Sequence, residues 1–216
     1  MLARIISILI GYACGHFLTG FFYGKTQHVD LRKVGSGNVG TTNTYRNLGS
    51  KAGILTLLGD VFKVVLSVLI VWFIFRGNAD VNVKVLEYYA ALGTILGHNF
   101  PIFMKFHGGK GIACTGGLMV AVCPICVPVC LTLILATVLI TKYVSLGSIL
   151  VCISFFIQIL IFGQKGMLGL AGADLTEVYI LAAVVMVLGI ARHHANIGRL
   201  LKGTENKFSF KPKKEA

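Results

Sequence analysis

The sequence predicts an all-α integral membrane protein with about seven transmembrane helices, two of them short. Hydrophobic residues make up 56% of the 216 residues and charged residues only 13%, whereas a soluble domain has roughly 45–50% and about 25%. The mean hydropathy is +0.82. The apolar residues fall into long runs, and basic residues concentrate in the polar segments between them. We therefore expect a single polytopic membrane domain over residues 1–216, ending in a basic cytoplasmic tail at 203–216.

Seven apolar runs predict the helices. They cover residues 2–22, 52–75, 85–104, 110–123, 125–141, 146–163 and 176–193. The first has the ~20 residues that span a bilayer. It lacks a small-residue cleavage site before a soluble domain, so we interpret it as a helix rather than a signal peptide. Pro124 and Pro128 interrupt the run from 110 to 141. A single helix there would measure ~48 Å against a ~30 Å hydrocarbon core, so two short helices fit better.

The distribution of charge predicts the orientation. The net charge of +12 could suggest nucleic acid, but the basic residues lie mainly in segments 24–51 and 105–110, at Lys142 and in the tail. The opposite side holds Arg4, Arg76, Lys84 and Lys165. Cytoplasmic loops carry the excess of Lys and Arg, so the N-terminus is expected outside and the C-terminus in the cytoplasm.

A polar stretch at 35–49 interrupts this apolar pattern. Its glycines let backbone N–H groups approach a ligand, and successive N–H groups form anion-binding concavities. Short hydroxyl and amide side chains add hydrogen-bonding groups, and Arg46 can form a two-point bond to a phosphate. The candidate residues are Ser36, Gly37, Asn38, Thr42, Asn43 and Arg46. The alternative is a flexible polar loop between two helices.

A second stretch, at 97–111, follows the third run. Gly108 and Gly109 precede Lys110 at the start of the next predicted helix. A helix N-terminus binds anions through its unpaired N–H groups, and the lysine adds a full charge. The stretch is not a Walker A loop, because Gly111 stands where Ser or Thr is required. His98 is either a substrate-binding residue or a buried, hydrogen-bonded structural one.

A third stretch, at 193–205, closes the last run. If it is helical, His193, Asn196 and Arg199 share a face. The alternative is that these residues anchor the helix to anionic headgroups. Glu205 is expected to pair with Arg or Lys. Ser145, at the start of the sixth run, is either a helix N-cap or a ligand-contacting residue on the same side of the membrane.

Two further features leave alternatives open. Asp60 and Lys63 are three residues apart in the second run, where they either neutralise each other or serve a function. Cys123 and Cys126 have redox spacing without a thioredoxin-like context, and most of the six cysteines are expected to be buried apolar residues. By spacing, no cluster has metal-ligand character and no Ser or Cys is paired with a base.

The three polar stretches together resemble the bacterial acyl-phosphate:glycerol-3-phosphate acyltransferases. The resemblance is carried by 35–49, 97–111 and 193–205, and the segment around Ser145 is also similar. His107 stands where that family usually has lysine, and Ala195 where glutamate is common. The resemblance implies acyl transfer from acyl phosphate to the 1-hydroxyl of sn-glycerol 3-phosphate, giving lysophosphatidic acid and phosphate. It also implies a bacterial cell membrane, a site on the cytoplasmic side and no metal or cofactor. Coupling to an enzyme that forms acyl phosphate would fit.

The expected roles follow the chemistry of the residues. Ser36, Gly37 and Asn38 would hold the acyl-phosphate group, with Thr42 and Asn43 in support. Arg46 and Lys110 would grip the glycerol phosphate, and Ser145, His193 and Asn196 would position the acceptor. We expect Ser36, His193 and Asn196 to be catalytic, and the remaining substrate-binding residues to be His98, Gly108, Gly109, Arg199 and Glu205. Either His193 or the leaving phosphate could take the proton. The rival class is a transporter or binding protein for phosphate or phosphorylated small molecules, which would need gates on both sides.

Overall fold

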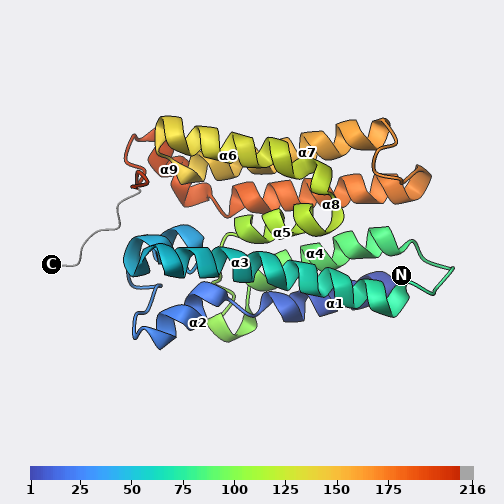
Figure 1. Ribbon diagram of the computed structural model, residues 1–216, viewed down its shortest axis with the longest axis horizontal. Coiled ribbons are helices and arrows are strands. Elements are labelled where there is room, and N and C mark those ends of the chain that lie inside the picture. Colours follow the sequence, from blue (N-terminus) through green and yellow to red (C-terminus); the bar gives the residue numbers. More distant parts are fainter. Residues whose placement is uncertain (210–216) are drawn as a thin grey trace.

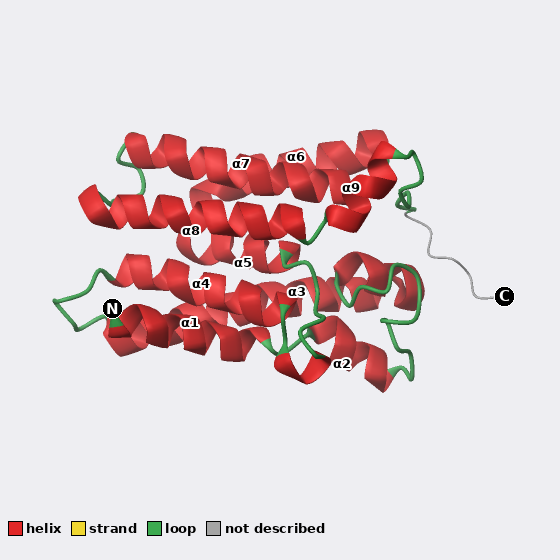
Figure 2. Cartoon of the chain, turned by 180° about the vertical axis from the view of Figure 1, so that it is seen from behind, coloured by secondary structure: helices red, strands yellow, loops and turns green. Residues whose placement is uncertain are grey.

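The computed structural model describes residues 1–209, and over that range the chain is helical without strands. The helices lie nearly parallel to one long axis, and α5 lies between a half formed by α1–α4 and a half formed by α6–α8 (Figures 1 and 2). The α-helices are α1 (Leu2–Gly15), α2 (Thr19–Thr26), α3 (Thr41–Phe75), α4 (Val83–Asn99), α5 (Ile112–Val122), α6 (Val127–Thr141), α7 (Val144–Gln164), α8 (Gly172–Ala191) and α9 (His194–Leu201). Two 3₁₀ turns, η1 (Ile102–Met104) and η2 (Pro124–Cys126), complete the chain.

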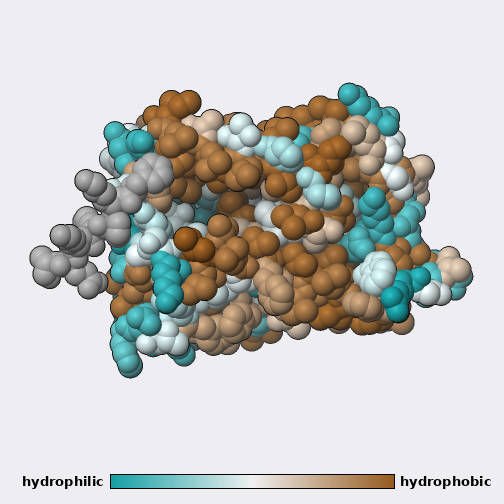
Figure 3. All heavy atoms as spheres, in the orientation of Figure 1, coloured by the Kyte–Doolittle hydropathy of each residue, from teal (hydrophilic) through white to brown (hydrophobic). Residues whose placement is uncertain are grey.

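The surface supports an integral membrane protein. Hydrophobic side chains cover the middle of the face in Figure 3, and hydrophilic ones gather towards its two ends. Within residues 1–209, five segments are long and apolar enough to cross a bilayer: Leu2–Thr26, Thr41–Phe75, Pro124–Thr141, Val144–Gln164 and Gly172–Ala191. α4 has 17 residues and α5 only 11, which for α5 is about 16 Å of helix. The count of seven and the orientation of the termini stay predictions.

Two helix boundaries differ from those expected. The run at 2–22 is not one helix: α1 ends at Gly15, Leu18 is extended, and α2 begins at Thr19. The segment 41–51, expected as loop, is the first part of α3, which bends sharply at Gly49 (φ 83°, ψ 179°). That backbone conformation is accessible essentially only to glycine. Hydropathy missed both features because it registers apolar content and not backbone breaks.

Glycines allow α1 and α4 to pack with their backbones in contact. Gly15 on α1 faces Gly97 on α4, Gly11 on α1 faces the α4 backbone at Ala90, and Gly93 on α4 faces the α1 backbone at Ile8. A Cβ added to Gly11 would lie 2.0 Å from the Ala90 carbonyl oxygen, and one added to Gly97 would lie 2.2 Å from that of Tyr12. Small residues at four-residue spacing are typical of membrane helix pairs. This packing fixes the C-terminal end of α4, from which the loop carrying Lys110 departs.

Candidate active site

The polar loop before α3 is organised by the side chain of Asn43. This side chain is 2% exposed; its Oδ1 accepts from the Ser36 N–H at 2.9 Å, and its Nδ2 donates to the carbonyls of Leu31 and Val34 at 3.1 Å each. Gly35 and Gly37 have positive φ angles of 59° and 71°, a region that favours glycine. The loop is therefore a rigid turn that ends at the N-terminus of α3, and Ser36 and Gly37 are exposed on it.

The second polar stretch folds back onto the end of α4. The Gly108 N–H donates to the Asn99 carbonyl at 3.1 Å, and the Gly109 N–H to the His98 carbonyl at 3.0 Å. The Arg192 guanidinium, at the end of α8, donates to the carbonyls of both glycines and lies over the Phe100 ring. Arg192 was not among the predicted site residues, since the sequence does not place it beside this loop. Lys110 is thereby held at the start of α5.

Lys110 begins a chain of polar contacts that reaches α9. Its Nζ donates to Asn196 Oδ1 at 2.6 Å, and Asn196 Nδ2 donates to Glu205 Oε1 at 2.8 Å. Arg199 Nε donates to Glu205 Oε2 at 2.7 Å. Asn196 is 5% exposed and the Glu205 side chain 5%. The second and third predicted stretches therefore meet, as drawn around α9 and the α5 N-terminus in Figure 1.

The segment after α9, residues 204–208, crosses the same end of the bundle. The Phe208 N–H donates to the Lys142 carbonyl at 2.7 Å, and the Phe208 ring lies 5.1 Å from that of Tyr45 on α3. Arg46 donates to the Asn206 carbonyl at 3.1 Å. This crossing segment brings the first predicted stretch to the other two through Arg46. Neither Asn206 nor Phe208 carried a signal in the sequence for such a role.

Burial and neighbouring charges shift the pKa values of three groups here. Burial, together with three nearby arginines, lowers the pKa of Lys110 to about 8. Burial lowers the pKa of His193 to about 4, and its Nδ1 lies 2.7 Å from the Gly189 carbonyl oxygen. Burial alone would raise the pKa of Glu205, but hydrogen bonds from Asn196 and Arg199 outweigh it and lower that pKa. At neutral pH the carboxylate is therefore ionised and the imidazole neutral.

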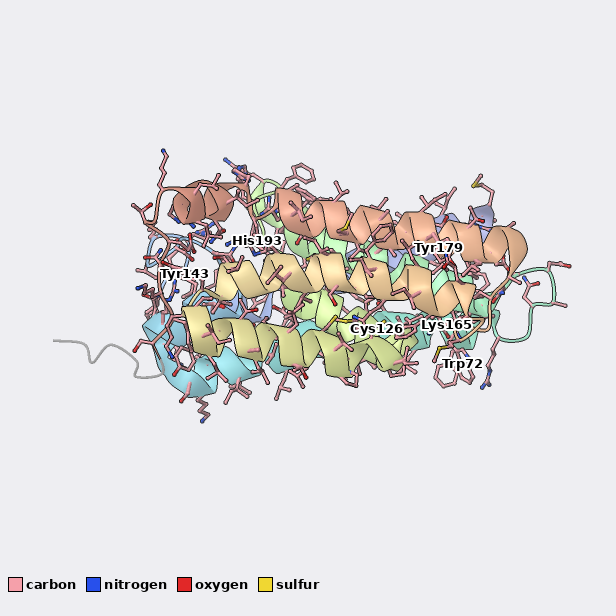
Figure 4. The ribbon with its side chains drawn as sticks, turned by 90° about the horizontal axis from the view of Figure 1, so that it is seen from above. Trp72, Cys126, Tyr143, Lys165, Tyr179 and His193 are labelled. Atoms are coloured by element: carbon pink, nitrogen blue, oxygen red, sulfur yellow. The ribbon has the colours of Figure 1, made fainter. Side chains whose placement is uncertain are left out.

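The remaining predicted residues are placed in different ways. The Ser145 hydroxyl is buried without a hydrogen-bond partner in the described structure, yet it lies close enough to Glu205 to help lower that pKa. Asn38 Oδ1 accepts from the Gly40 N–H at 2.9 Å, and Thr42 is half-buried in the first turn of α3. His193 and Tyr143 lie at the same end of the bundle in Figure 4. The His98 side chain, by contrast, is buried at 3% exposure and contacts Lys63, not the Lys110–Glu205 chain.

The cluster has an excess of positive charge. Arg46, Arg192 and Arg199 all lie close enough to Lys110 to help lower its pKa, and Glu205 is the nearby carboxylate that opposes their effect. A multiply charged anion bound here would balance the excess positive charge. Arginine and lysine bind phosphate oxygens strongly. Part of the predicted basic tail, residues 210–216, lies outside the described residues.

Two other groups of reactive side chains lie elsewhere. Asp60, His98 and Cys114 have ligand atoms within 4.8 Å of one another. They come from three helices, so sequence spacing could not reveal them; the Lys63 Nζ already contacts both Asp60 and His98. Cys123 and Cys126 have sulfur atoms 3.3 Å apart. Figure 4 shows Cys126 well separated from His193 along the bundle.

Comparisons with known proteins identify the family to which the chain belongs. Residues 5–203 match the family described as glycerol-3-phosphate acyltransferase. The glycerol-3-phosphate acyltransferase of Trichlorobacter lovleyi is 38% identical over 208 residues, covering 96% of this chain and 99% of that protein. That of Clostridioides difficile is 38% identical over 209 residues, covering 96% of each. The crystal structure of PlsY (YgiH), an integral membrane glycerol 3-phosphate acyltransferase in its glycerol 3-phosphate form, gives a TM-score of 0.81 at 34% identity, covering 95% of this chain and 96% of that one. With this coverage, the chain belongs to the glycerol-3-phosphate acyltransferase family.

Proposed function

We propose that the protein transfers a fatty acyl group from acyl phosphate to the 1-hydroxyl of sn-glycerol 3-phosphate. The products are 1-acylglycerol 3-phosphate (lysophosphatidic acid) and inorganic phosphate. The observation that carries the proposal is the cationic cluster of Arg46, Lys110, Arg192 and Arg199, with Glu205 as its carboxylate, beside two glycine-rich loops. Similar structures described as the glycerol 3-phosphate and lysophosphatidic acid forms of PlsY support the choice of acceptor and product.

The residues divide between the two substrates. Lys110 and Arg46 bind the phosphate of glycerol 3-phosphate, with Arg199 completing the charge. Ser36, Gly37 and Asn38, on the rigid turn before α3, face the acyl phosphate, and Asn43 acts by holding this turn through the Ser36 N–H. Asn196 and Ser145 position the glycerol. Holding two phosphates and aligning one hydroxyl is the main requirement, and orientation alone lowers a barrier by up to ~7–11 kcal/mol.

The transfer needs one proton acceptor. The glycerol hydroxyl oxygen attacks the acyl carbonyl carbon, the bond from that carbon to the phosphate oxygen breaks, and phosphate leaves with the electron pair. The hydroxyl proton goes to His193 or to the leaving phosphate. His193 is neutral at pH 7 and able to accept, but its pKa of about 4 makes it a weak base. His193→Ala with most of its turnover retained would assign the proton to the phosphate.

The location of the reaction follows from the charges. We infer a bacterial cell membrane with the site facing the cytoplasm, because the cationic loops lie at that end under the positive-inside rule. The acyl chain would lie between helices and open to lipid. An enzyme that forms acyl phosphate would supply the donor.

Phosphate release by the purified, detergent-solubilised protein tests the proposal. With palmitoyl phosphate as donor, release should depend on glycerol 3-phosphate, should yield lysophosphatidic acid in equal amount and should not respond to chelator. No turnover, combined with saturable uptake of glycerol 3-phosphate into liposomes, would replace the acyltransferase with a transporter.

A further inference from the structure

Lys63 is a buried cation in the middle of α3, outside the cationic cluster of Arg46, Lys110, Arg192 and Arg199. It is 3% exposed, and its partner Asp60 1%. A charge at this depth in a membrane protein is costly and needs partners. We propose that Lys63, through His98, is a positioning residue for the acyl transfer: it fixes the loop that carries Lys110. The kinetic test of this inference rests on the proposed function. A second test, by amine labelling, is independent of it.

The contacts of Lys63 join three segments. Its Nζ lies 2.9 Å from Asp60 Oδ1 on the same helix, 2.7 Å from His98 Nδ1 on α4 and 3.0 Å from the Phe17 carbonyl oxygen. Lysine only donates, so His98 Nδ1 accepts and the ring hydrogen sits on Nε2. This defines one tautomer and one orientation for the buried ring.

One part of this arrangement serves the fold. The break between α1 and α2 leaves the carbonyls of Gly15 and Phe17 without intrahelical partners, and Lys63 lies within hydrogen-bond distance of both, at 3.5 and 3.0 Å. Unsatisfied backbone groups are very costly at membrane depth. Asp60 offsets the added charge and is itself within 3.4 Å of the Thr19 hydroxyl. If Lys63 only capped the broken helix, the contacts with these two carbonyls and with Asp60 would be sufficient.

The other part reaches the candidate active site. The His98 ring packs directly on Gly109: a Cβ added to that glycine would lie 2.0 Å from His98 Nε2. The Gly109 N–H donates to the His98 backbone carbonyl, and the Arg192 guanidinium donates to the Gly109 carbonyl. Lys110 is the next residue, and its Nζ depends on this position to meet Asn196 at 2.6 Å. Lys63 therefore fixes the orientation of the His98 ring, and the ring fixes the position of the loop at Gly109. The loop in turn fixes the position of Lys110.

Two variants separate the structural role from the positioning role. Lys63→Met removes both. His98→Asn keeps an oxygen acceptor near Lys63, so the helix break remains capped, but removes the ring from Gly109. The matched control is Thr94→Val. It breaks a different buried polar contact between α3 and α4, the 2.7 Å bond between the Ser67 and Thr94 hydroxyls, and leaves the loop unchanged.

The kinetic expectation is a change in one Michaelis constant. His98→Asn and Lys63→Met should raise KM for glycerol 3-phosphate about tenfold or more, since small misplacements of a binding group are costly. KM for acyl phosphate should stay unchanged, and Thr94→Val should leave both constants unchanged. A purely structural role would instead lower the amount of active protein and leave both KM values as in the wild type, which would overturn the proposal.

Amine labelling gives an answer that needs no turnover. Lys110 should react slowly with acetic anhydride in the wild type and in Thr94→Val, because its Nζ is bonded to Asn196. In His98→Asn it should react several-fold faster, measured by mass spectrometry in detergent. Equal labelling of Lys110 in all three proteins would overturn the positioning role even if the wild type proved to have no acyltransferase activity. Faster labelling without activity in the wild type would overturn only the proposed function.

Discussion

The two ends of the helix bundle are both polar, but they differ in the balance and pairing of their charged side chains. At the end formed by α9 and the α5 N-terminus, four cationic side chains lie around Glu205. At the opposite end, Arg4 pairs with Glu177, which also accepts from the Tyr89 hydroxyl, and Asp174 accepts from Asn82. A cavity of about 540 Å³ lies at this opposite end, lined in part by Arg4, Asp80 and Asp174.

The difference between the two ends shows whether an empty cavity or an excess of positive charge is the better indicator of the candidate site. The cavity of about 540 Å³ lies at the end that holds Arg4, where acids outnumber bases around the opening and Arg4 already has a carboxylate partner. The excess of positive charge lies at the end formed by α9 and the α5 N-terminus. There Glu205 and the crossing segment 204–208 occupy the space among the cationic side chains. A site filled by its own side chains offers little empty volume, so unpaired charge is the better guide to an anion-binding site here.

The largest effect should come from removing Lys110. Lys110→Ala should lower kcat/KM for glycerol 3-phosphate by about 10²–10³, or about 3–4 kcal/mol at ~1.36 kcal/mol per tenfold, which lies within the range typical of losing one member of a buried charge pair. Initial rates of phosphate release at varied glycerol 3-phosphate measure it. Lys165→Ala is the control from the opposite end of the bundle (Figure 4) and should leave kcat/KM unchanged. Equal losses in both variants would remove the distinction between the ends.

The pH dependence should report the same lysine. The pKa of Lys110 is lowered to about 8, so the amine is charged below that pH and loses its proton above it. Only the charged form binds phosphate well, and kcat/KM for glycerol 3-phosphate should therefore fall by about tenfold per pH unit above pH 8.

Lys110→Arg is the matching variant for the pH profile. Arginine stays charged throughout this range, so the alkaline fall should disappear even if the absolute rate is lower. Any fall on the acid side, where the substrate phosphate dianion takes up a proton near pH ~6, should be the same in both proteins. An alkaline limb that persists in the arginine variant would assign it to another group.

Residue patterns predicted the all-helical membrane fold and the residues of a candidate site, but they did not predict the contacts among those residues. The apolar runs matched the helices from residue 124 onwards to within a few residues, because lipid exposure demands continuous apolar sequence. The break at 16–18 escaped prediction, since the side chain that donates to its carbonyls is that of Lys63, which is distant in sequence. Lys110, Asn196 and Arg199 were predicted and are assembled. Arg192 was missed, because its contact with Gly108 and Gly109 exists only once α8 lies beside α4.

A smaller effect is expected at the opposite end. Arg4→Gln breaks the pair with Glu177, whose partners are 32% and 21% exposed. Partly exposed pairs contribute about 1 kcal/mol or less. The midpoint of thermal unfolding in detergent should fall slightly, while KM for glycerol 3-phosphate stays at the wild-type value. A rise in this KM would mean that the two ends are coupled, contrary to the separation of charge described above.

The smallest effect on turnover should come from the cysteine pair. Cys123 and Cys126 are buried at 2% and 0% exposure, with sulfur atoms 3.3 Å apart at the η2 turn. Cys126 lies away from His193 in Figure 4. Replacing both with Ala removes two sulfur atoms from a packed region and should cost about 1 kcal/mol of stability for each small cavity. Phosphate release should stay within about twofold of the wild type, because no bond of the anion cluster passes through these residues. A loss comparable to that of Lys110→Ala would give the pair a role in the reaction, and the end-to-end separation of charge would then no longer explain where the chemistry takes place.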